Sequence, residues 1–497
     1  MKTGFFVVSI IGGLLALGCN LTTGVRSDQQ PSGLEPSVIP GNDLPNTTAK
    51  NPASQSDASG PSDLLQPEDF AYLGAFRLPG NEDRPRTFAY GGNAMTFNPD
   101  GDPDGVDDGF PGSLFVMGHD RIAYGDVPEG NQVAEINIPL PVQGKNLEEL
   151  ATAEFIQGFS NVTAGAFTEM EEIPKVGMAY LNRKETGPLI HLAWGQHLQP
   201  QDIASHAWFL PDLKTPGLTG FWFIGNQDLY SVNGYMFEIP VEWADANTGG
   251  RYLGTGRMRD GGQGGMGPTL LAYRPWLDDG SPAPNGTHLE EVPLLLYEKS
   301  SNTEEFVNCM DGYQHADEWE GGAWLSTVDG KSAVMFAGTK ATGNKTWYGY
   351  IHPDGPEHVC VDAHVTDYPT CRMADGSLCP QSDMGGCCSE EEGGCISMRG
   401  WMSSRFDAQI ILYNPDDLAK VAAGEMEPWE PQPYSAMDID EFLFLSAPEW
   451  ETQMVASGDQ RRYRIGDVAF DRVSGLLYVL EQYADEAKPV VHVWKVG

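Results

Sequence analysis

Helical periodicity is the feature that this sequence most clearly lacks. Across 497 residues, apolar side chains seldom recur at the three- and four-residue spacing of an amphipathic helix, and the best helical segment is Asp416–Ala423. A parallel α/β fold needs a helix between successive strands, so the sequence excludes that class.

Specific catalytic motifs are also missing. No G-x-S-x-G elbow lies at a strand-to-helix turn, and there is no P-loop and no dinucleotide fingerprint within a βαβ unit. The closely spaced glycines between Gly262 and Gly267 lack that context and indicate a turn. No sequence pattern therefore names a reaction.

Positive charge is scarce. Asp and Glu number 70 against 30 Lys and Arg, which gives a formal net charge of −40. Such a surface repels nucleic acid and anionic lipid headgroups, so nucleic acid is excluded as a partner. It suits a solubilised, exported protein that can attract cations.

The amino end predicts export. Lys2 precedes an apolar run, Phe5–Leu17, that is too short to span a bilayer and ends at Gly18-Cys19. Residues 1–19 resemble a bacterial lipoprotein signal, which implies lipidation of Cys19 and anchoring in the bacterial cell envelope, at the outer membrane or the cell surface. The alternative is plain secretion, with Cys19 lost or paired.

Residues 20–64 have little that could form a core. They are rich in Ser, Pro, Asn, Thr and Gly, and no aromatic residue occurs between Phe6 and Phe70. Because such a segment cannot bury enough apolar area to offset its ordering entropy, it is predicted to be a disordered tether.

Residues 65–497 consist of short apolar or alternating runs bounded by Gly, Pro, Asn and Asp, which indicate strands. The repeating antiparallel pattern predicts an all-β fold, a β-propeller of about six blades, with five to seven possible. A circular array must close, and Ala71–Leu78 is expected to pair with Val490–Val496. The rival architectures are a large β-sandwich or two β-domains.

Several segments of this body are similar to a family of exported, mostly uncharacterised bacterial proteins with a propeller body. The similarity covers most of residues 68–497, and the family has no established activity to transfer. The segments that carry it are YGGNAMTFNP (Tyr90–Pro99), GSLFVMGHD (Gly112–Asp120), VAEINIP (Val133–Pro139), GYMFEIPVEW (Gly234–Trp243), Ile411–Tyr434 and the closing GLLYVLEQYADEAKPVVHVW.

Residues 352–398 interrupt the strand pattern and hold six cysteines. They are interpreted as an insertion between strands, held together by disulfides, which export permits. Zinc is the alternative, but no C-x-x-C pair is present. Six cysteines allow fifteen pairings, and Cys309 is expected to stay free or to pair outside the chain. The disulfide candidates are Cys360, Cys371, Cys379, Cys387, Cys388 and Cys395.

An acidic loop predicts a calcium site. Carboxylates alternate along the loop and Gly105 takes the sixth position, where a Ca²⁺ loop turns sharply. Pro111 stands where an EF-hand carries its last ligand, so the loop is closer to the calcium loops of thrombospondin type 3 or dockerin repeats. The alternative is an acidic turn that binds nothing tightly. The candidate ligands are Asp100, Asp102, Asp104, Asp107 and Asp108.

Three histidines follow or precede predicted strands, namely His119, His206 and His315. Strand ends of a propeller can converge on its central channel, and Asp317 lies next to His315. These four residues are the candidate catalytic set, as acid and base or as metal ligands. The alternative for each is a surface histidine, a hydrogen-bonded core histidine, or an acidic loop.

The leading interpretation is a lipid-anchored or secreted propeller, stabilised by calcium, that binds an extracellular carbohydrate or protein. A second interpretation is a hydrolase that acts on a glycan, lactone or ester. A third is a structural envelope component whose cysteine-rich insertion mediates assembly.

Overall fold

The computed structural model describes the compact unit Gly60–Gly497 over most of its length. The described residues are 63–80, 85–102, 105, 109–118, 132–165, 174–196, 203–227, 231–257, 264–299, 307–314, 316–342, 345–347, 401–403, 405–444 and 465–497. The predicted signal and almost all of the predicted tether lie outside them.

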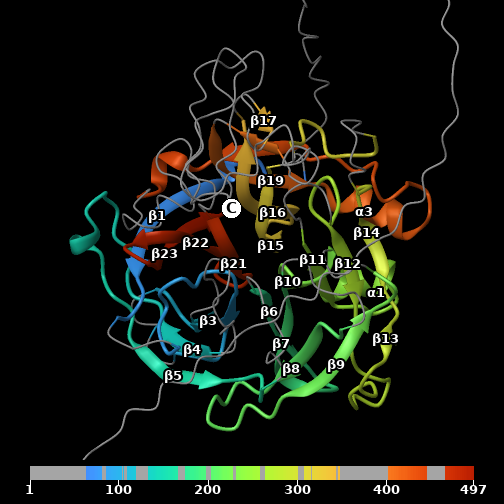
Figure 1. Ribbon diagram of the computed structural model, residues 1–497, viewed down its shortest axis with the longest axis horizontal. Coiled ribbons are helices and arrows are strands. Elements are labelled where there is room, and N and C mark those ends of the chain that lie inside the picture. The colour runs from blue at the N-terminus through green and yellow to red at the C-terminus, as the bar shows by residue number, and fades with distance from the viewer. Residues whose placement is uncertain are drawn as a thin grey trace, which may run out of the picture. The chain divides into compact units, whose positions relative to one another are not determined.

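Five antiparallel sheets form a β-propeller, so the all-β prediction is confirmed and the sandwich alternative is wrong (Figure 1). The first sheet contains β2 (Met95–Asn98), β3 (Ser113–Met117), β4 (Gln132–Asn137) and β5 (Phe155–Asn161). The second contains β6 (Pro174–Arg183), β7 (Gly187–Gln196), β8 (His206–Phe209) and β9 (Thr219–Ile224), and β13 (His288–Leu289) joins its edge in parallel.

The third sheet contains β10 (Tyr235–Glu238), β11 (Leu253–Gly256), β12 (Leu270–Tyr273) and β14 (Val292–Leu295). The fourth contains β15 (Glu318–Ser326), β16 (Ser332–Ala341), β19 (Phe406–Tyr413) and β20 (Ser435–Asp438). The fifth contains β21 (Ile465–Asp471), β22 (Leu476–Asp485), β23 (Lys488–Val496) and β1 (Phe70–Arg77).

The innermost strands close into a ring. β2 contacts β6, β6 contacts β10, β10 contacts β15, β15 contacts β21, and β21 contacts β2 (Figure 1). Glycines permit the closest approaches: a Cβ at Gly466 would lie 1.8 Å from the carbonyl oxygen of Gly92, and one at Gly321 would lie 2.9 Å from the Val468 nitrogen. The ring positions the beginnings of all five innermost strands side by side.

The fifth sheet joins the two ends of the described body. Its outer strand β1 pairs antiparallel with β23, with Ala71 opposite Lys495 and Arg77 opposite Val490. The predicted pairing of Ala71–Leu78 with Val490–Val496 is therefore confirmed. The register shifts between Tyr72 and Gly74, and the backbone of Gly74 lies against Val142, which leaves no room for a side chain there.

Apolar side chains fill the spaces between the sheets rather than the axis. Five large clusters of buried residues each join two neighbouring sheets. Between the third and fourth sheets, for example, Tyr235 and Phe237 pack with Trp319, Trp324 and Phe336. Successive residues of a strand therefore face opposite neighbouring sheets, as the pleat requires.

Helices are few and short in the described chain. α3 (Pro415–Ala422) agrees within one residue with the predicted helical segment and begins at Asn414, whose side chain accepts from the Asp416 nitrogen. α1 (Val241–Asn247) was not predicted. Single 3₁₀ turns occur at Pro67–Asp69, Leu147–Glu149 and Asp440–Phe442.

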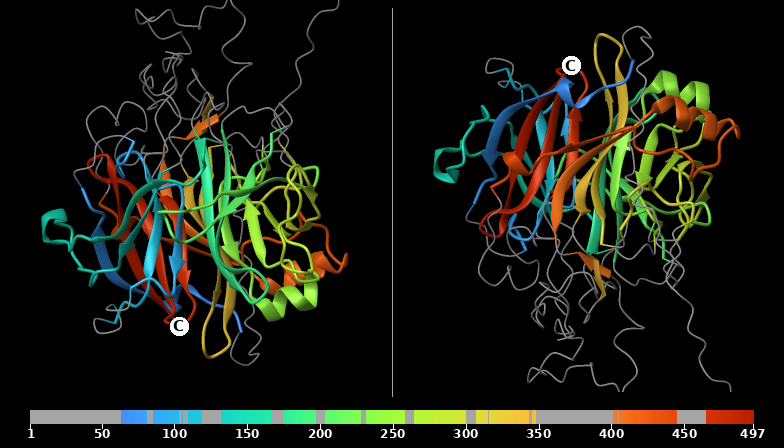
Figure 2. Two further views of the ribbon diagram at one scale, coloured as in Figure 1. Left: turned by 90° about the horizontal axis from the view of Figure 1, so that it is seen from below. Right: turned by 90° about the horizontal axis from the view of Figure 1, so that it is seen from above.

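The propeller has two distinct ends, which we name from the innermost strands. We call the end at which these strands all begin the entry face, and the end toward which they run the opposite face. The C-terminus and both helices lie at the opposite face (Figure 2). The first described residues lie there too, since the Leu65 nitrogen donates to the Ser332 oxygen and the Gly497 nitrogen donates to the Asp69 oxygen.

A pair of short strands extends the fourth sheet. β17 (Lys345–Trp347) follows β16, β18 (Trp401–Ser403) precedes β19, and the two pair antiparallel. The chain between them therefore departs from and returns to a single hairpin stem. The predicted insertion 352–398, with its six cysteines, lies outside the described residues.

Candidate functional site

Buried polar side chains are concentrated at the entry face. They occupy the first residues of the innermost strands and the last residues of the strands paired with them, where core packing alone would favour apolar groups. Buried groups of this kind need partners and are found at functional sites more often than chance. They are Asn93, Ser231, Asn233, Arg257, Asp317, Glu318, Glu320, Thr339, Asp467, Glu481, Gln482 and Asp485.

Asp467 fastens the first sheet to the fifth beside the axis. It is fully buried, its nitrogen donates to the Gly92 oxygen at 2.9 Å, and its Oδ2 accepts from the Met95 nitrogen at 2.9 Å. Gln482 adds a bond from Nε2 to the Asn93 Oδ1 at 3.3 Å. These contacts form a buried polar layer at the entry face, where the first and fifth sheets meet.

Two tyrosines beside this polar layer have a strained backbone. Tyr90 (φ 64°) and Tyr483 (φ 57°) both adopt the left-handed conformation, which costs a residue with a β-carbon about 1 kcal/mol or more. Their rings lie 6.4 Å apart, and the Tyr90 nitrogen donates to the Ala487 oxygen. Tyr90 is half-buried, so an aromatic surface remains accessible at the entry face.

His206, a predicted catalytic residue, begins β8 with its ring fully buried. Its Nδ1 is 2.8 Å from the Ser205 Oγ and its Nε2 is 3.0 Å from the Thr255 Oγ1. Burial, and secondarily the nearby His191, lowers the pKa of His206 to about 3. A neutral, enclosed ring with both nitrogens engaged fits a structural role.

Asp317 is also enclosed. Its carboxylate accepts from the Lys340 Nζ at 2.8 Å and from the Ala341 and Gln314 nitrogens at 2.9 and 3.0 Å. Burial raises its pKa, and Lys340 opposes that shift. These contacts join β15 to the end of β16, so they too fit a structural role. His119 and His315 lie outside the described residues.

The predicted calcium loop joins β2 to β3, which places it at the opposite face. Asp100 is exposed, and its Oδ2 accepts from the Tyr180 hydroxyl at 3.4 Å. Burial and then Asp100 raise the pKa of Tyr180 to about 12. Asp102 is half-buried, and Asp104, Asp107 and Asp108 lie outside the described residues.

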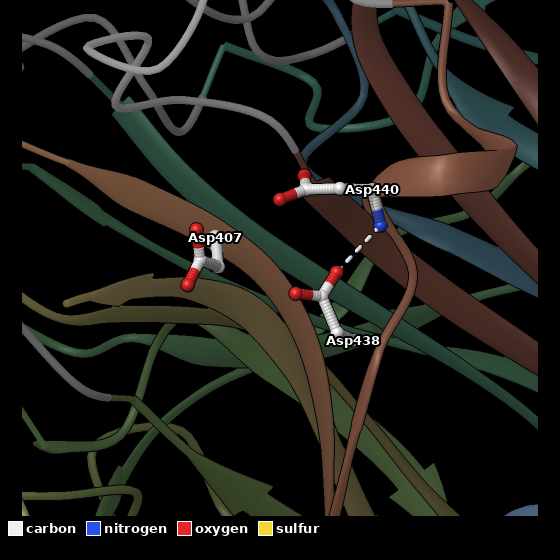
Figure 3. Close-up of side chains that lie close together, drawn as sticks. All are labelled: Asp407, Asp438 and Asp440. Carbon is white, nitrogen blue, oxygen red and sulfur yellow. Dashed lines mark hydrogen bonds between the residues drawn. The ribbon is translucent and has the colours of Figure 1, made fainter.

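A different carboxylate group lies at the outer edge of the fourth sheet (Figure 3). Oxygens of Asp407, Asp438 and Asp440 all lie within 4.8 Å of one another. Arg405 pairs with Asp407 at 2.7 Å, while backbone nitrogens donate to Asp438 and Asp440. The set has the chemistry to hold a hard cation, although these donors already balance part of its charge. The spacing of residues in the sequence does not reveal this carboxylate group, because Asp407 lies 31 and 33 positions before the other two. Only the pairing of β19 with β20 brings them together.

Cys309 is half-buried and forms no disulfide within the described chain. Burial raises the pKa of its thiol, which makes the reactive thiolate scarcer. The six predicted disulfide cysteines lie outside the described residues.

Among the described residues, no helix is long and apolar enough to cross a membrane. No family model matches the chain, and none of the curated proteins is similar to it.

Proposed function

We propose that this protein is an exported, lipid-anchored β-propeller that binds an extracellular ligand at its entry face. The observation that carries the proposal is the concentration of buried polar groups at that face, beside the strained aromatic pair Tyr90 and Tyr483. A site that combines apolar surface with a few convergent polar groups is typical of ligand binding.

The position of the amino end supports ligand binding at the entry face. Residues 63–65 lie along β16 at the opposite face, so a lipid on Cys19 would be joined to the body through that face. The entry face would then be the end of the body farther from the point of attachment, where an extracellular carbohydrate or protein can reach it. The test is a titration of the purified protein with a panel of extracellular polysaccharides and proteins. Saturable binding of one member of the panel would support the proposal.

A hydrolase is the second candidate, acting on a glycan, lactone or ester. It has less support, because the two predicted catalytic residues that the structure describes, His206 and Asp317, are enclosed and hydrogen-bonded. Release of product from a bound glycan during the titration would favour the hydrolase. Association of the protein through residues 352–398, without any ligand, would favour a structural envelope component.

We also propose that Ca²⁺ stabilises the loop of Asp100 and Asp102. Chelation should lower the melting temperature of the wild-type protein, because a ligand present at 100 times its Kd stabilises the folded state by about 2.7 kcal/mol. Asp102→Asn should abolish the difference between calcium and chelator. Glu154→Gln, which changes an exposed carboxylate directly before β5 of the same sheet, should preserve it. An unchanged wild-type melting temperature on chelation would end the calcium proposal.

A further inference from the structure

Two buried hydrogen-bond donors at the entry face have no acceptor within the described chain. They are the Nδ2 of Asn233 and the Nε1 of Trp319, on residues that are 0 % and 1 % exposed. Leaving a buried donor without an acceptor destabilises the fold, so a folded protein rarely keeps one without a bound water or ligand.

The direction of the Asn233 amide is fixed by its neighbour. Arg257 Nη1 donates to the Asn233 Oδ1 at 2.9 Å, and a guanidinium can only donate, so the oxygen must face Arg257 and the NH₂ group must face away from it. Arg257 is itself only 2 % exposed and lies across Gly234, where a Cβ would come within 2.9 Å of its side chain.

Asn233 and Trp319 belong to adjacent parts of the inner ring. Asn233 lies in the bend that leads into β10, two residues before Tyr235, and Tyr235 packs in one cluster with Trp319. β10 contacts β15 directly. The two donors therefore come from neighbouring sheets near the start of contacting strands, and a buried guanidinium lies beside one of them.

We propose that Asn233, Arg257 and Trp319 form a donor subsite for the carboxylate of an acidic sugar. This inference rests on the proposed binding function and names its ligand class. All three side chains offer N–H groups, and a carboxylate supplies only acceptors, strengthened by the charge of Arg257. The carboxylates of the same strand, Glu318 and Glu320, already have interactions of their own.

A sugar acid fits this face better than an acidic peptide. The half-buried ring of Tyr90, beside Tyr483, offers an aromatic surface on which a sugar ring can stack. The amides of Asn93 and Gln482 lie on the same face and are of the type that binds sugar hydroxyls.

Trp319→Phe tests the subsite, because it removes one N–H and keeps an aromatic ring. Affinity for trigalacturonate should fall about tenfold, the effect of one lost hydrogen bond, while galactotriose should bind weakly to both proteins. Trp222→Phe is the matched control. Trp222 is equally buried, but its Nε1 already donates to the Ala283 oxygen at 2.9 Å, so this variant should lose stability and keep its affinity.

The alternatives give different results. Equal affinity of wild type and Trp319→Phe for trigalacturonate would overturn the subsite, and the proposed function would stand if any extracellular ligand still bound. Binding of pentaglutamate alone, weakened by Trp319→Phe, would overturn the assignment to a sugar. If no member of either panel bound, the subsite and the proposed binding function would fail together.

Discussion

Gly466→Ala is expected to destabilise the propeller by about 3 kcal/mol or more, the upper end of the usual cost of forcing a side chain into a packed core. Its methyl group would lie 1.8 Å from the Gly92 oxygen, which is a backbone atom and cannot rotate away. The Asp467 nitrogen donates to that same oxygen. The two innermost strands β2 and β21 would have to separate and open the ring.

Gly158→Ala is the control for this prediction. A Cβ at Gly158 meets no atom within 4 Å, and its backbone is not left-handed, so the change should stay within about 0.5 kcal/mol. Urea unfolding followed by fluorescence measures both variants. If the two midpoints agreed, the close approach of the inner strands would be wrong.

Acid should destabilise the protein well above the pH at which its carboxylates titrate. Burial lowers the pKa of His191 and of His206 from 6.5 to about 3, and in His206 the proximity of His191 adds to the shift. The unfolded chain takes up these protons first as the pH falls below 6.5. Each histidine therefore removes about 2.5 kcal/mol of stability between pH 7 and pH 4.5.

His191→Leu should remove close to half of that loss. Both ring nitrogens of His191 lack a hydrogen-bond partner in the described part of the chain, and the ring packs against Trp208 and Trp276 at 5.6 and 5.9 Å. An apolar side chain of similar volume should therefore be tolerated at pH 7. The urea midpoints of wild type and variant at pH 7 and pH 4.5 measure this difference. An equal loss of stability in the two proteins would contradict the prediction.

The sequence predicted the propeller and its closure, and the five blades lie at the lower end of the expected range of five to seven. Each blade has four antiparallel strands, and β13 adds a fifth strand in parallel to the second. Outer strands such as β5 and β20 give only a weak signal in the sequence. Their residues are only partly buried, so their sequences lack the apolar character that identified the inner strands.

The candidate site was harder to predict because it depends on contacts between distant segments. Strand-end position did locate His206 and Asp317 near the entry face, but position could not reveal that Ser205, Thr255 and Lys340 would enclose them. Asn233 and Trp319 gave no signal, since a missing acceptor is a property of packing.

The central claim is that ligand binds at the entry face, and the affinities of Tyr90→Asn and Val473→Asn measure it most directly. Asparagine tolerates the left-handed backbone of Tyr90, so the first variant removes the accessible ring alone. Val473 is 85 % exposed in a turn of the opposite face and serves as its counterpart. We expect Tyr90→Asn to weaken binding at least tenfold while Val473→Asn binds as the wild type does. The reverse pattern would contradict the claim, because the ligand would then bind at the opposite face.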